Sequence, residues 1–525
     1  MGPPCGPPAM TAAADLVLTN GEVHPLADQD ETVEAVAVRD GVICRLGRSS
    51  ELDFLVGVET TVVDLEGRVL LPGFVDAHVH LTKQGQSLVH ADLRGADGRS
   101  ACLERLRETA EGAGATAGPT DDWVLGFGFD ESGWDDPRYL TREDLDAVSE
   151  SRPVAAIRED GHVAAVNSVV LDRHLDEMPA GGLRTEGGEP TGVLVETAVD
   201  VVYRLIEPDR PAALALLRAA QAEANRLGVT GVHDMVRRSH APWVYRHLDR
   251  TGELTLRVRV NYWSDHLDAL LEAGLGTNDG SAMVRVGAVK SFTDGSLGGF
   301  TAKLSAPYAD GEGVGQWVVP PDELAALAEQ VEANGLQLAV HAIGDEAIDT
   351  TLEVLAGTDD PAAARHRVEH AELTTDAAIE RFAELGVVAS VQPNFLKWMG
   401  PDGLYERRLG PERTALANRF RDLLDAGVPL AFGSDGMPMD PLVGVHLAVN
   451  HPMDDQRLSV TEALRAYTSG GAYAGFDEDR LGTIEVGKLA DLVALDRSPW
   501  DHPDAIDAID VALTVVDGQV VYDAR

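Results

Sequence analysis

The sequence is short of cysteine and of lysine. Three cysteines, Cys5, Cys44 and Cys102, are scattered over 525 residues without a Cys-x-x-Cys spacing, so neither a disulfide framework nor a cysteine metal site is indicated. Five lysines stand beside 38 arginines, and 87 acidic residues outnumber the 43 basic ones, which gives a formal net charge of −44. Since no basic stripe is present to neutralise phosphates, the composition argues against nucleic acid as a partner.

Long apolar runs are also missing, although the apolar content of 44% is ordinary for a soluble enzyme. No run of about 18 or more apolar residues occurs, which argues against a membrane span. The first ten residues have neither the basic start nor the apolar middle of a signal peptide. We therefore expect a disordered tail over residues 1–12 and a cytoplasmic protein.

The excess of acidic residues has two interpretations. Repulsion among so many carboxylates burdens a fold at low ionic strength and is screened in molar salt, where the Debye length shrinks to about 3 Å. We favour adaptation to a halophilic cytoplasm. A merely acidic proteome of high GC content is the alternative.

The most specific motif is a pair of histidines, His78 and His80, which follows the apolar run that starts at Val69. On a strand, residues two apart point to the same face, so the two imidazoles converge. Imidazole is the commonest biological ligand of zinc-like ions. The pair therefore predicts a divalent metal site.

Between the two ends of the chain, apolar β-branched runs alternate with helical patterns, as expected of parallel strands joined by crossover helices. Eight such strands form an α/β fold, the (β/α)8 TIM barrel, whose catalytic residues lie at the C-terminal ends of the strands. We predict the strands at residues 74–80, 228–234, 255–263, 285–292, 336–342, 366–371, 387–393 and 429–435.

Two further units are predicted around this barrel of residues 67–481. Short strands with tight turns at both termini indicate a small β-sandwich built from residues 13–66 and 482–525. Residues from about 84 to 226 are too many for one loop, so we expect an inserted α/β subdomain there. Because this insertion leaves the first strand beside His80, it would roof the site.

Motifs along residues 14 to 525 resemble the amidohydrolase superfamily, and more narrowly amidohydrolase family 3, the YtcJ-like branch of metal-dependent hydrolases. The pair His78 and His80 is the most specific part of this resemblance, and supporting segments extend nearly to the C-terminus. The matching segments are Phe74-Val-Asp-Ala-His78-Val-His80, Trp123-Val-Leu-Gly-Phe-Gly-Phe-Asp, Asp160-Gly-His-Val-Ala-Ala-Val-Asn-Ser, Lys290-Ser-Phe-Thr-Asp-Gly-Ser-Leu-Gly, His341-Ala-Ile-Gly-Asp, His366-Arg-Val-Glu-His370, Phe432-Gly-Ser-Asp435 and Gly482-Thr-Ile-Glu-Val-Gly-Lys-Leu-Ala-Asp-Leu-Val.

The resemblance implies a set of metal ligands for one or two divalent ions, with zinc as the expected metal. It also implies that Asp435, besides being a ligand, takes the proton from the attacking water. The implied ligands are His78, His80, Lys290, His341, His370 and Asp435.

Lys290 needs separate treatment because a protonated lysine has no acceptor with which to bind a cation. It closes an apolar strand, where a bare ammonium would be costly to bury. Carbamylation by CO₂ would turn it into a carboxylate that bridges two metals, as the resemblance implies. The alternative is a salt bridge to Asp435 in a site with one metal.

The expected reaction is hydrolysis of an amide or another C–N bond of a small molecule, with a metal-activated water as nucleophile. Side chains of the insertion and of the strand ends are candidates for substrate contact, although Trp134 is equally well explained as subdomain core. The substrate-binding candidates are Trp134, Asp160, His162, His233 and Gln392.

The sequence is also compatible with three other functions. A deaminase on the same barrel would bind one metal and would carry a glutamate three residues after His341, where this chain has Gly344. A barrel with a regulatory or binding role would be expected to have lost ligands, and isomerase or lyase chemistry could use the same metals. The expected partner is a small amide-type substrate, and a homodimer is compatible with the sequence.

Overall fold

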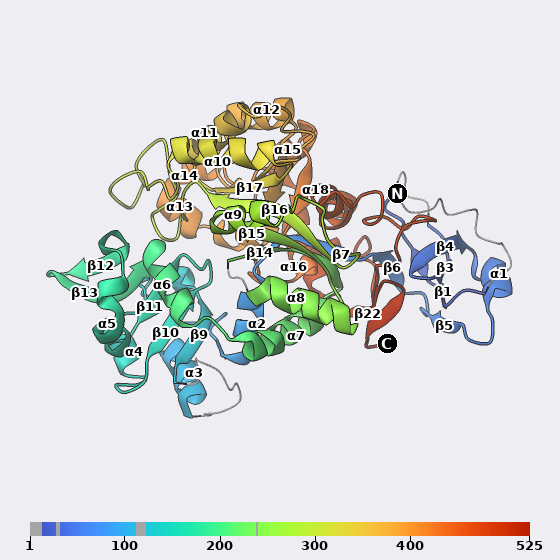
Figure 1. Cartoon of the computed structure of the whole chain (residues 1–525), viewed down its shortest axis with the longest axis horizontal. Coiled ribbons are helices and arrows are strands. Elements are labelled where there is room, and N and C mark those ends of the chain that lie inside the picture. The colour runs from blue at the N-terminus through green and yellow to red at the C-terminus, as the bar shows by residue number, and fades with distance from the viewer. Residues whose placement is uncertain (1–12, 28–31, 112–121, 238–239) are drawn as a thin grey trace.

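The computed structural model describes residues 13–27, 32–111, 122–237 and 240–525 (Figure 1), so the predicted tail at residues 1–12 lies outside the described residues. Its central sheet has eight strands, each parallel to its neighbours. The first and last strands nearly close the sheet, because the Asp435 amide donates to the His78 carbonyl at 2.7 Å. The strands are β7 (Phe74–Val79), β14 (Val229–Val236), β15 (Arg257–Trp263), β16 (Val284–Phe292), β17 (Gln337–Ala342), β18 (Arg367–His370), β19 (Val388–Val391) and β20 (Leu430–Phe432).

These strands confirm the predicted barrel. They are buried along nearly their whole length, as expected of parallel strands whose outer face is covered by helices. The covering helices include α7 (Arg210–Arg226), α8 (His240–Thr251), α10 (Pro321–Ala333), α11 (Asp345–Leu355), α12 (Asp376–Leu385), α15 (Phe420–Asp425) and α16 (Pro441–Val449).

A second sheet is inserted between β7 and β14 and confirms the expected α/β subdomain; it forms the teal lobe in Figure 1. It has six strands in the order β12-β13-β11-β10-β9-β8. Its strands are β8 (Ala91–Asp92), β9 (Val124–Phe129), β10 (Val154–Arg158), β11 (Val163–Val166), β12 (Leu183–Glu186) and β13 (Glu189–Val195). Its helices are α3 (Arg99–Glu111), α4 (Arg142–Asp146), α5 (Ser168–His174) and α6 (Thr197–Leu205).

The helices on either side of the insertion belong to the barrel. Helix α2 (Leu81–Val89) lies so close to α7 that a Cβ on Gly85 would come within 2.4 Å of the Leu216 carbonyl oxygen. Residues of α7 such as Leu217 pack into the barrel core. The structure therefore places α7 with the barrel, whereas the sequence boundaries put residues up to 226 in the insertion.

The two chain ends build a sandwich of two sheets, as predicted. One sheet has the order β4-β3-β1-β5 and the other β2-β6-β21-β22-β23, so strands from both termini pair in the second sheet. β6, which the sequence boundaries gave to the barrel, lies in this sandwich. The strands are β1 (Leu16–Thr19), β2 (Glu22–Val23), β3 (Ala35–Arg39), β4 (Val42–Gly47), β5 (Thr61–Asp64), β6 (Val69–Pro72), β21 (Leu492–Leu495), β22 (Val511–Val516) and β23 (Gln519–Asp523).

A buried ion pair joins the barrel to the sandwich. The guanidinium of Arg257, at the start of β15, donates twice to the Asp491 carboxylate at 2.6 and 3.0 Å, just before β21 begins. It also reaches Asp517 at 2.8 Å. The bidentate geometry fixes the sandwich at the end of the barrel away from the predicted site.

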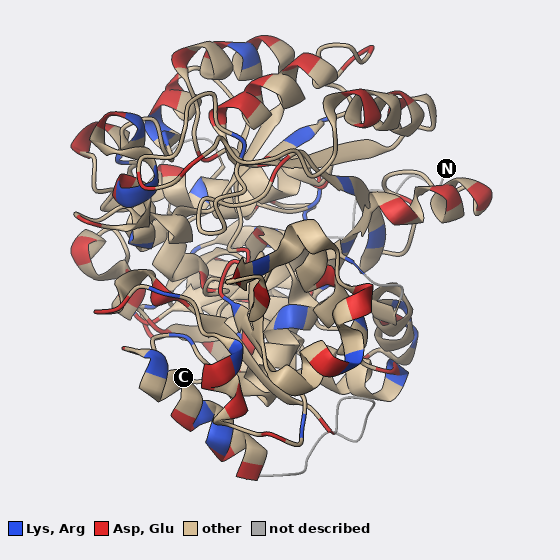
Figure 2. Cartoon of the chain, turned by 90° about the vertical axis from the view of Figure 1, so that its left-hand side faces the viewer, with Lys and Arg blue, Asp and Glu red and all other residues tan. Residues whose placement is uncertain are grey.

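Figure 2 marks the positions of Asp and Glu along the chain, and these recur on helices and loops across the whole view. Across the described ranges, no helix is both long enough and apolar enough to cross a bilayer.

Candidate active site

The six predicted ligands all lie at or just beyond the C-terminal ends of barrel strands, on β7, β16, β17, β18 and after β20. His78, His80 and Asp435 come closest together, since one ligand atom from each lies within 4.8 Å of the others. The Asp435 Oδ1 atom is 3.8 Å from His78 Nε2 and 3.6 Å from His80 Nε2. Two imidazoles and a carboxylate at this spacing suit a divalent ion.

The other two histidines continue this cluster. The His370 ring centroid is 4.7 Å from that of His78 and 4.6 Å from that of His341. All four imidazoles therefore line one region at the mouth of the barrel.

Each of these imidazoles donates one ring N–H to a protein acceptor, which leaves the other nitrogen free to bind a metal. Such partners fix the tautomer and orientation of metal-binding histidines. Burial lowers the pKa of all four well below the usual value, so the rings are neutral, as ligation requires. The pairs are His78 Nδ1 with Glu369 (2.6 Å), His80 Nδ1 with the Met235 carbonyl (3.0 Å), His341 Nε2 with the Gly295 carbonyl (2.9 Å) and His370 Nδ1 with Gln392 (2.7 Å).

Asp435 occupies a left-handed backbone position, with φ of 51°. The approach of its loop to β7 is close, since a Cβ on Gly433 would come within 2.5 Å of the His78 amide nitrogen. Burial raises the pKa of Asp435 to about 7, despite the opposing effects of Lys83 and Lys290. A carboxyl group with a pKa near neutrality can both accept and release a proton.

Lys290 is buried at the end of β16, and its Nζ atom has no hydrogen-bond partner among the described residues. It lies 4.8 Å from the centroid of the Phe292 ring. The structure also shows no ion pair within 4.0 Å between the described residues Lys290 and Asp435. Burial lowers the pKa of Lys290 to about 8. A lysine left without a partner in this way fits conversion to a carbamate.

Two side chains of the inserted subdomain, Asp160 and His162, face this cluster from the turn between β10 and β11. The His162 ring lies 5.2 Å from that of His341, and its Nδ1 atom is 2.9 Å from Glu196. Burial disfavours the charged imidazole, but the attraction of Glu196 and Asp160 prevails and raises the pKa of His162 to about 9.

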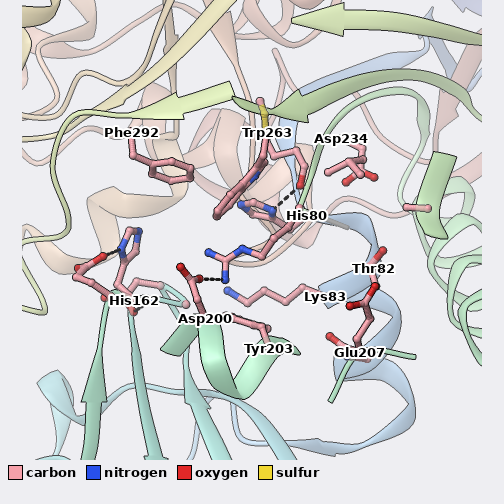
Figure 3. A pocket seen from close by; sticks show the side chains of 18 of the residues that line it. His80, Thr82, Lys83, His162, Asp200, Tyr203, Glu207, Asp234, Trp263 and Phe292 are labelled. Carbon is pink, nitrogen blue, oxygen red and sulfur yellow. Dashed lines mark hydrogen bonds and ion pairs between the residues drawn. The ribbon is translucent and has the colours of Figure 1, made fainter. Parts of the chain in front are cut away.

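Two cavities meet at the cluster and share Asp160 and His162. The larger, of about 150 Å³, lies between the barrel mouth and the insertion (Figure 3). The smaller, of about 30 Å³, is lined by three of the predicted ligands. In the larger cavity the walls include His80, Lys83, Tyr203, Arg237, Trp263 and Phe292, and in the smaller one His341, His370, Asp435, Phe395 and Met437.

Three predicted substrate contacts line neither cavity. Trp134 packs in the core of the subdomain, where its indole N–H donates to the Ala96 carbonyl at 2.8 Å. His233 accepts from Arg367 at 2.7 Å, and Gln392 is engaged by His370. In place of the predicted substrate contacts, Trp134 packs in the subdomain core, His233 contacts Arg367, and Gln392 orients His370.

Several residues of the site were missed by the sequence analysis. Glu369, which holds His78, stands directly before His370 in the sequence. Lys83, Tyr203 and Arg237 line the larger cavity. Lys83 could have been found, because it is one of five lysines and follows His80 by three positions.

Comparison with known proteins places this site in context. Residues 61–522 match the profile of a family described as "Amidohydrolase family". The chain is 32% identical to "Putative amidohydrolase YtcJ" of Bacillus subtilis (strain 168), over 96% of this chain and 98% of that protein. It is 28% identical to "N-substituted formamide deformylase" of Arthrobacter pascens, over 98% and 99% respectively.

A solved structure agrees with these matches. The crystal structure of an uncharacterized metal-dependent hydrolase from Pyrococcus furiosus superposes with a TM-score of 0.74 at 32% identity. The match covers 92% of this chain and 99% of that one. The similarity therefore extends over barrel, insertion and sandwich together.

Proposed function

The chain belongs to the amidohydrolase family, and we propose that it is a metal-dependent hydrolase that cleaves an amide-type C–N bond of a small molecule. The observation that carries the proposal is the convergence of His78, His80 and Asp435 at the barrel mouth, with ligand atoms within 4.8 Å of one another. They lie where two cavities meet, as an active site at the C-terminal face of a barrel should.

The donor set fits one or two divalent ions, and we propose zinc as the metal. Histidine-rich ligation with a carboxylate is typical of zinc. His78, His80, His341, His370 and Asp435 would hold it, with carbamylated Lys290 as a further carboxylate. A divalent ion bound there would lower the pKa of water and polarise the scissile carbonyl.

Asp435 supplies the proton transfer. Its carboxylate accepts a proton as the oxygen of water attacks the carbonyl carbon. It then donates that proton to the amine nitrogen as the C–N bond breaks. Burial raises the pKa of Asp435, which favours its acceptance of the proton.

The two cavities suggest how the substrate lies. The smaller one, of about 30 Å³, suits a small acyl group, and the larger one, of about 150 Å³, suits the amine portion. The relative named "N-substituted formamide deformylase" supports a small acyl group.

The deaminase alternative is disfavoured by the backbone at Gly344. A Cβ at this position would lie 1.9 Å from the Lys303 carbonyl oxygen. Because no side chain fits there, the glutamate that such a deaminase would carry three residues after His341 has no room. The regulatory alternative has no comparable support, since all six candidate ligands are present.

A screen of formyl and acetyl amides of primary amines tests the proposal. Amine release should be detected by wild-type protein, should stop after chelation and should return with added Zn²⁺. Asp435→Asn should lower kcat/KM at least about 100-fold, within the range of lost general acid–base catalysis. The matched control Asp454→Asn, at an exposed ion pair, should retain activity. Hydrolysis that survives both chelation and Asp435→Asn would contradict the proposal.

A further inference from the structure

Lys83 is a cation of the larger cavity that the proposed reaction does not use. It lies on α2, three residues after His80, and Figure 3 shows its side chain reaching into the cavity beside Asp200 and Tyr203. Its ammonium donates to the Glu159 carbonyl oxygen at 2.7 Å, the one hydrogen bond it makes within the described part of the chain. An ammonium carries three N–H groups, so two remain for a ligand.

Two of the three acidic side chains that attract Lys83 are already paired with other cations. Asp160 accepts from Arg158 at 2.7 Å, and Glu159 accepts from Lys397 at 2.5 Å. Among the described residues no carboxylate lies within 4.0 Å of the Lys83 ammonium. Asp435, Asp160 and Glu159 attract the Lys83 ammonium from a distance, but none of them forms a close ion pair with it among the described residues.

Glycine keeps the space beside this charge open. A Cβ on Gly161 would lie 3.0 Å from Lys83 Nζ and 3.1 Å from Tyr203 Oη. Its φ of +79° is also a conformation that other residues rarely adopt. The gap next to Gly161 is thus bordered by two hydrogen-bond donors, an ammonium and a phenol.

The opposite wall of the cavity is aromatic. The rings of Trp263 and Phe292 lie 4.6 Å apart. The Arg237 guanidinium stacks 4.0 Å from the Trp263 ring and is paired with Asp200. A ligand in this cavity would meet apolar rings on one side and the donors of Lys83 and Tyr203 on the other. The cavity is also lined by carboxylates, of which Asp200 is paired with Arg237 and Glu196 with His162.

We propose that the substrate is an amide whose amine portion carries a carboxylate, and that Lys83 and Tyr203 bind this carboxylate in the gap beside Gly161. This proposal rests on the proposed function. Water adds to the acyl carbon and the C–N bond breaks, which yields a carboxylic acid and an amine that keeps its own carboxylate. Because Lys83 lies close to both His80 and the cavity, the carboxylate is attached near the scissile nitrogen. Lys83 is therefore a specificity-determining residue.

Kinetics on a matched substrate pair tests the assignment. N-acetylphenylalanine and N-acetylphenethylamine share the acyl group and the ring, and only the first has a carboxylate. The wild-type protein should prefer the anion in kcat/KM. Lys83→Met should lower the ratio of the two kcat/KM values about 10- to 100-fold, as for a lost hydrogen bond between charged groups, mainly through KM. The matched control Lys488→Met, in a surface ion pair with Glu485, should keep the wild-type ratio.

Calorimetry with chelated protein separates this proposal from the proposed function. The anion should bind more tightly than the neutral amide to wild type, and Lys83→Met should remove the difference. Tyr203→Phe keeps the contact of Lys83 with Glu159, so it should reduce the difference in affinity less than Lys83→Met does. Equal binding of both compounds, or of neither at tens of millimolar, would overturn the anion site even if neutral amides are hydrolysed. Anion binding that depends on Lys83 without any amide hydrolysis would overturn the proposed function and leave the anion site standing.

Discussion

Burial sets the chemistry of single side chains at the barrel mouth. It keeps the four clustered imidazoles neutral and raises the pKa of Asp435 to about 7. It also isolates Lys290, whose amine has no partner among the described residues. The neutral imidazoles suit ligation, and a carboxyl group with a raised pKa suits proton transfer.

Lys290 provides the first prediction at this scale. Wild-type protein incubated with ¹³C-bicarbonate should show a carbamate signal in its ¹³C NMR spectrum, and Lys290→Ala should not. The variant should lose amide hydrolysis and regain part of it with added short-chain carboxylates, which replace the missing ligand. The salt bridge to Asp435 would be favoured instead if the metal-loaded wild type showed no carbamate.

The His162–Glu196 pair gives a prediction for pH. The pKa of His162 is raised from 6.5 to about 9 in the folded state. Its contribution to stability is therefore complete below about pH 6.5 and is lost as the pH rises through 9. The stability difference between wild type and His162→Gln should be smaller at pH 9.5 than at pH 6, by up to about 3 kcal/mol at about 1.4 kcal/mol per pKa unit.

Urea unfolding of chelated protein checks this, because a bound divalent cation would repel the charged imidazole. His174→Gln is the matched control, since His174 pairs with Glu177 near the surface and surface pairs contribute little. A difference that is constant across this pH range would contradict the assignment of a charged His162.

Sequence spacing predicted the His78–His80 pair, and the family resemblance supplied the other candidate ligands, but neither predicted their surroundings. His78 and His80 were predictable because residues two apart on a strand share a face. For Trp134 the structure agrees with the alternative of subdomain core, and His233 contacts Arg367 instead of a cavity, because only the folded chain brings Ala96 to one and Arg367 to the other. The contact of Lys83 with Glu159 likewise spans 76 positions in the sequence, which no local pattern reveals.

At the scale of elements, apolar runs predicted the eight barrel strands and missed where some of them end. The strand predicted at 366–371 ends at His370, whose φ is 72°. The strand predicted at 429–435 ends at Phe432, before Asp435 at φ of 51°. These positive φ values turn the chain out of the sheet at the candidate ligands His370 and Asp435.

The joint between barrel and sandwich gives a prediction at this scale. Arg257→Met would leave Asp491 buried without its partner and should lower the free energy of unfolding by about 3–5 kcal/mol. Arg218→Met, which removes an exposed pair with Glu253 at 2.6 Å, should cost about 0–1 kcal/mol. Denaturant midpoints of the two variants would be compared. Equal small losses would show that the joint contributes little to stability.

The whole molecule carries a net charge of −44, and Asp and Glu positions recur throughout the view of Figure 2. Repulsion among carboxylates acts over about 10 Å at 0.1 M salt and about 3 Å at 1 M. The melting temperature should therefore rise with KCl, most steeply below 1 M. An equally concentrated neutral osmolyte controls for preferential exclusion. Equal rises in both solutes, or a flat response from 0.1 to 2 M KCl, would remove the support for a halophilic protein.

Metal content is the most direct test of the central claim, that this barrel hydrolyses an amide-type bond with a divalent ion. Mass-spectrometric metal analysis of purified wild type should find one to two equivalents, with zinc expected from the histidine-rich ligands. The His78→Ala/His80→Ala variant should lose both the metal and the release of amine from acetyl and formyl amides. Wild-type protein that is free of metal yet hydrolyses these amides would contradict the account.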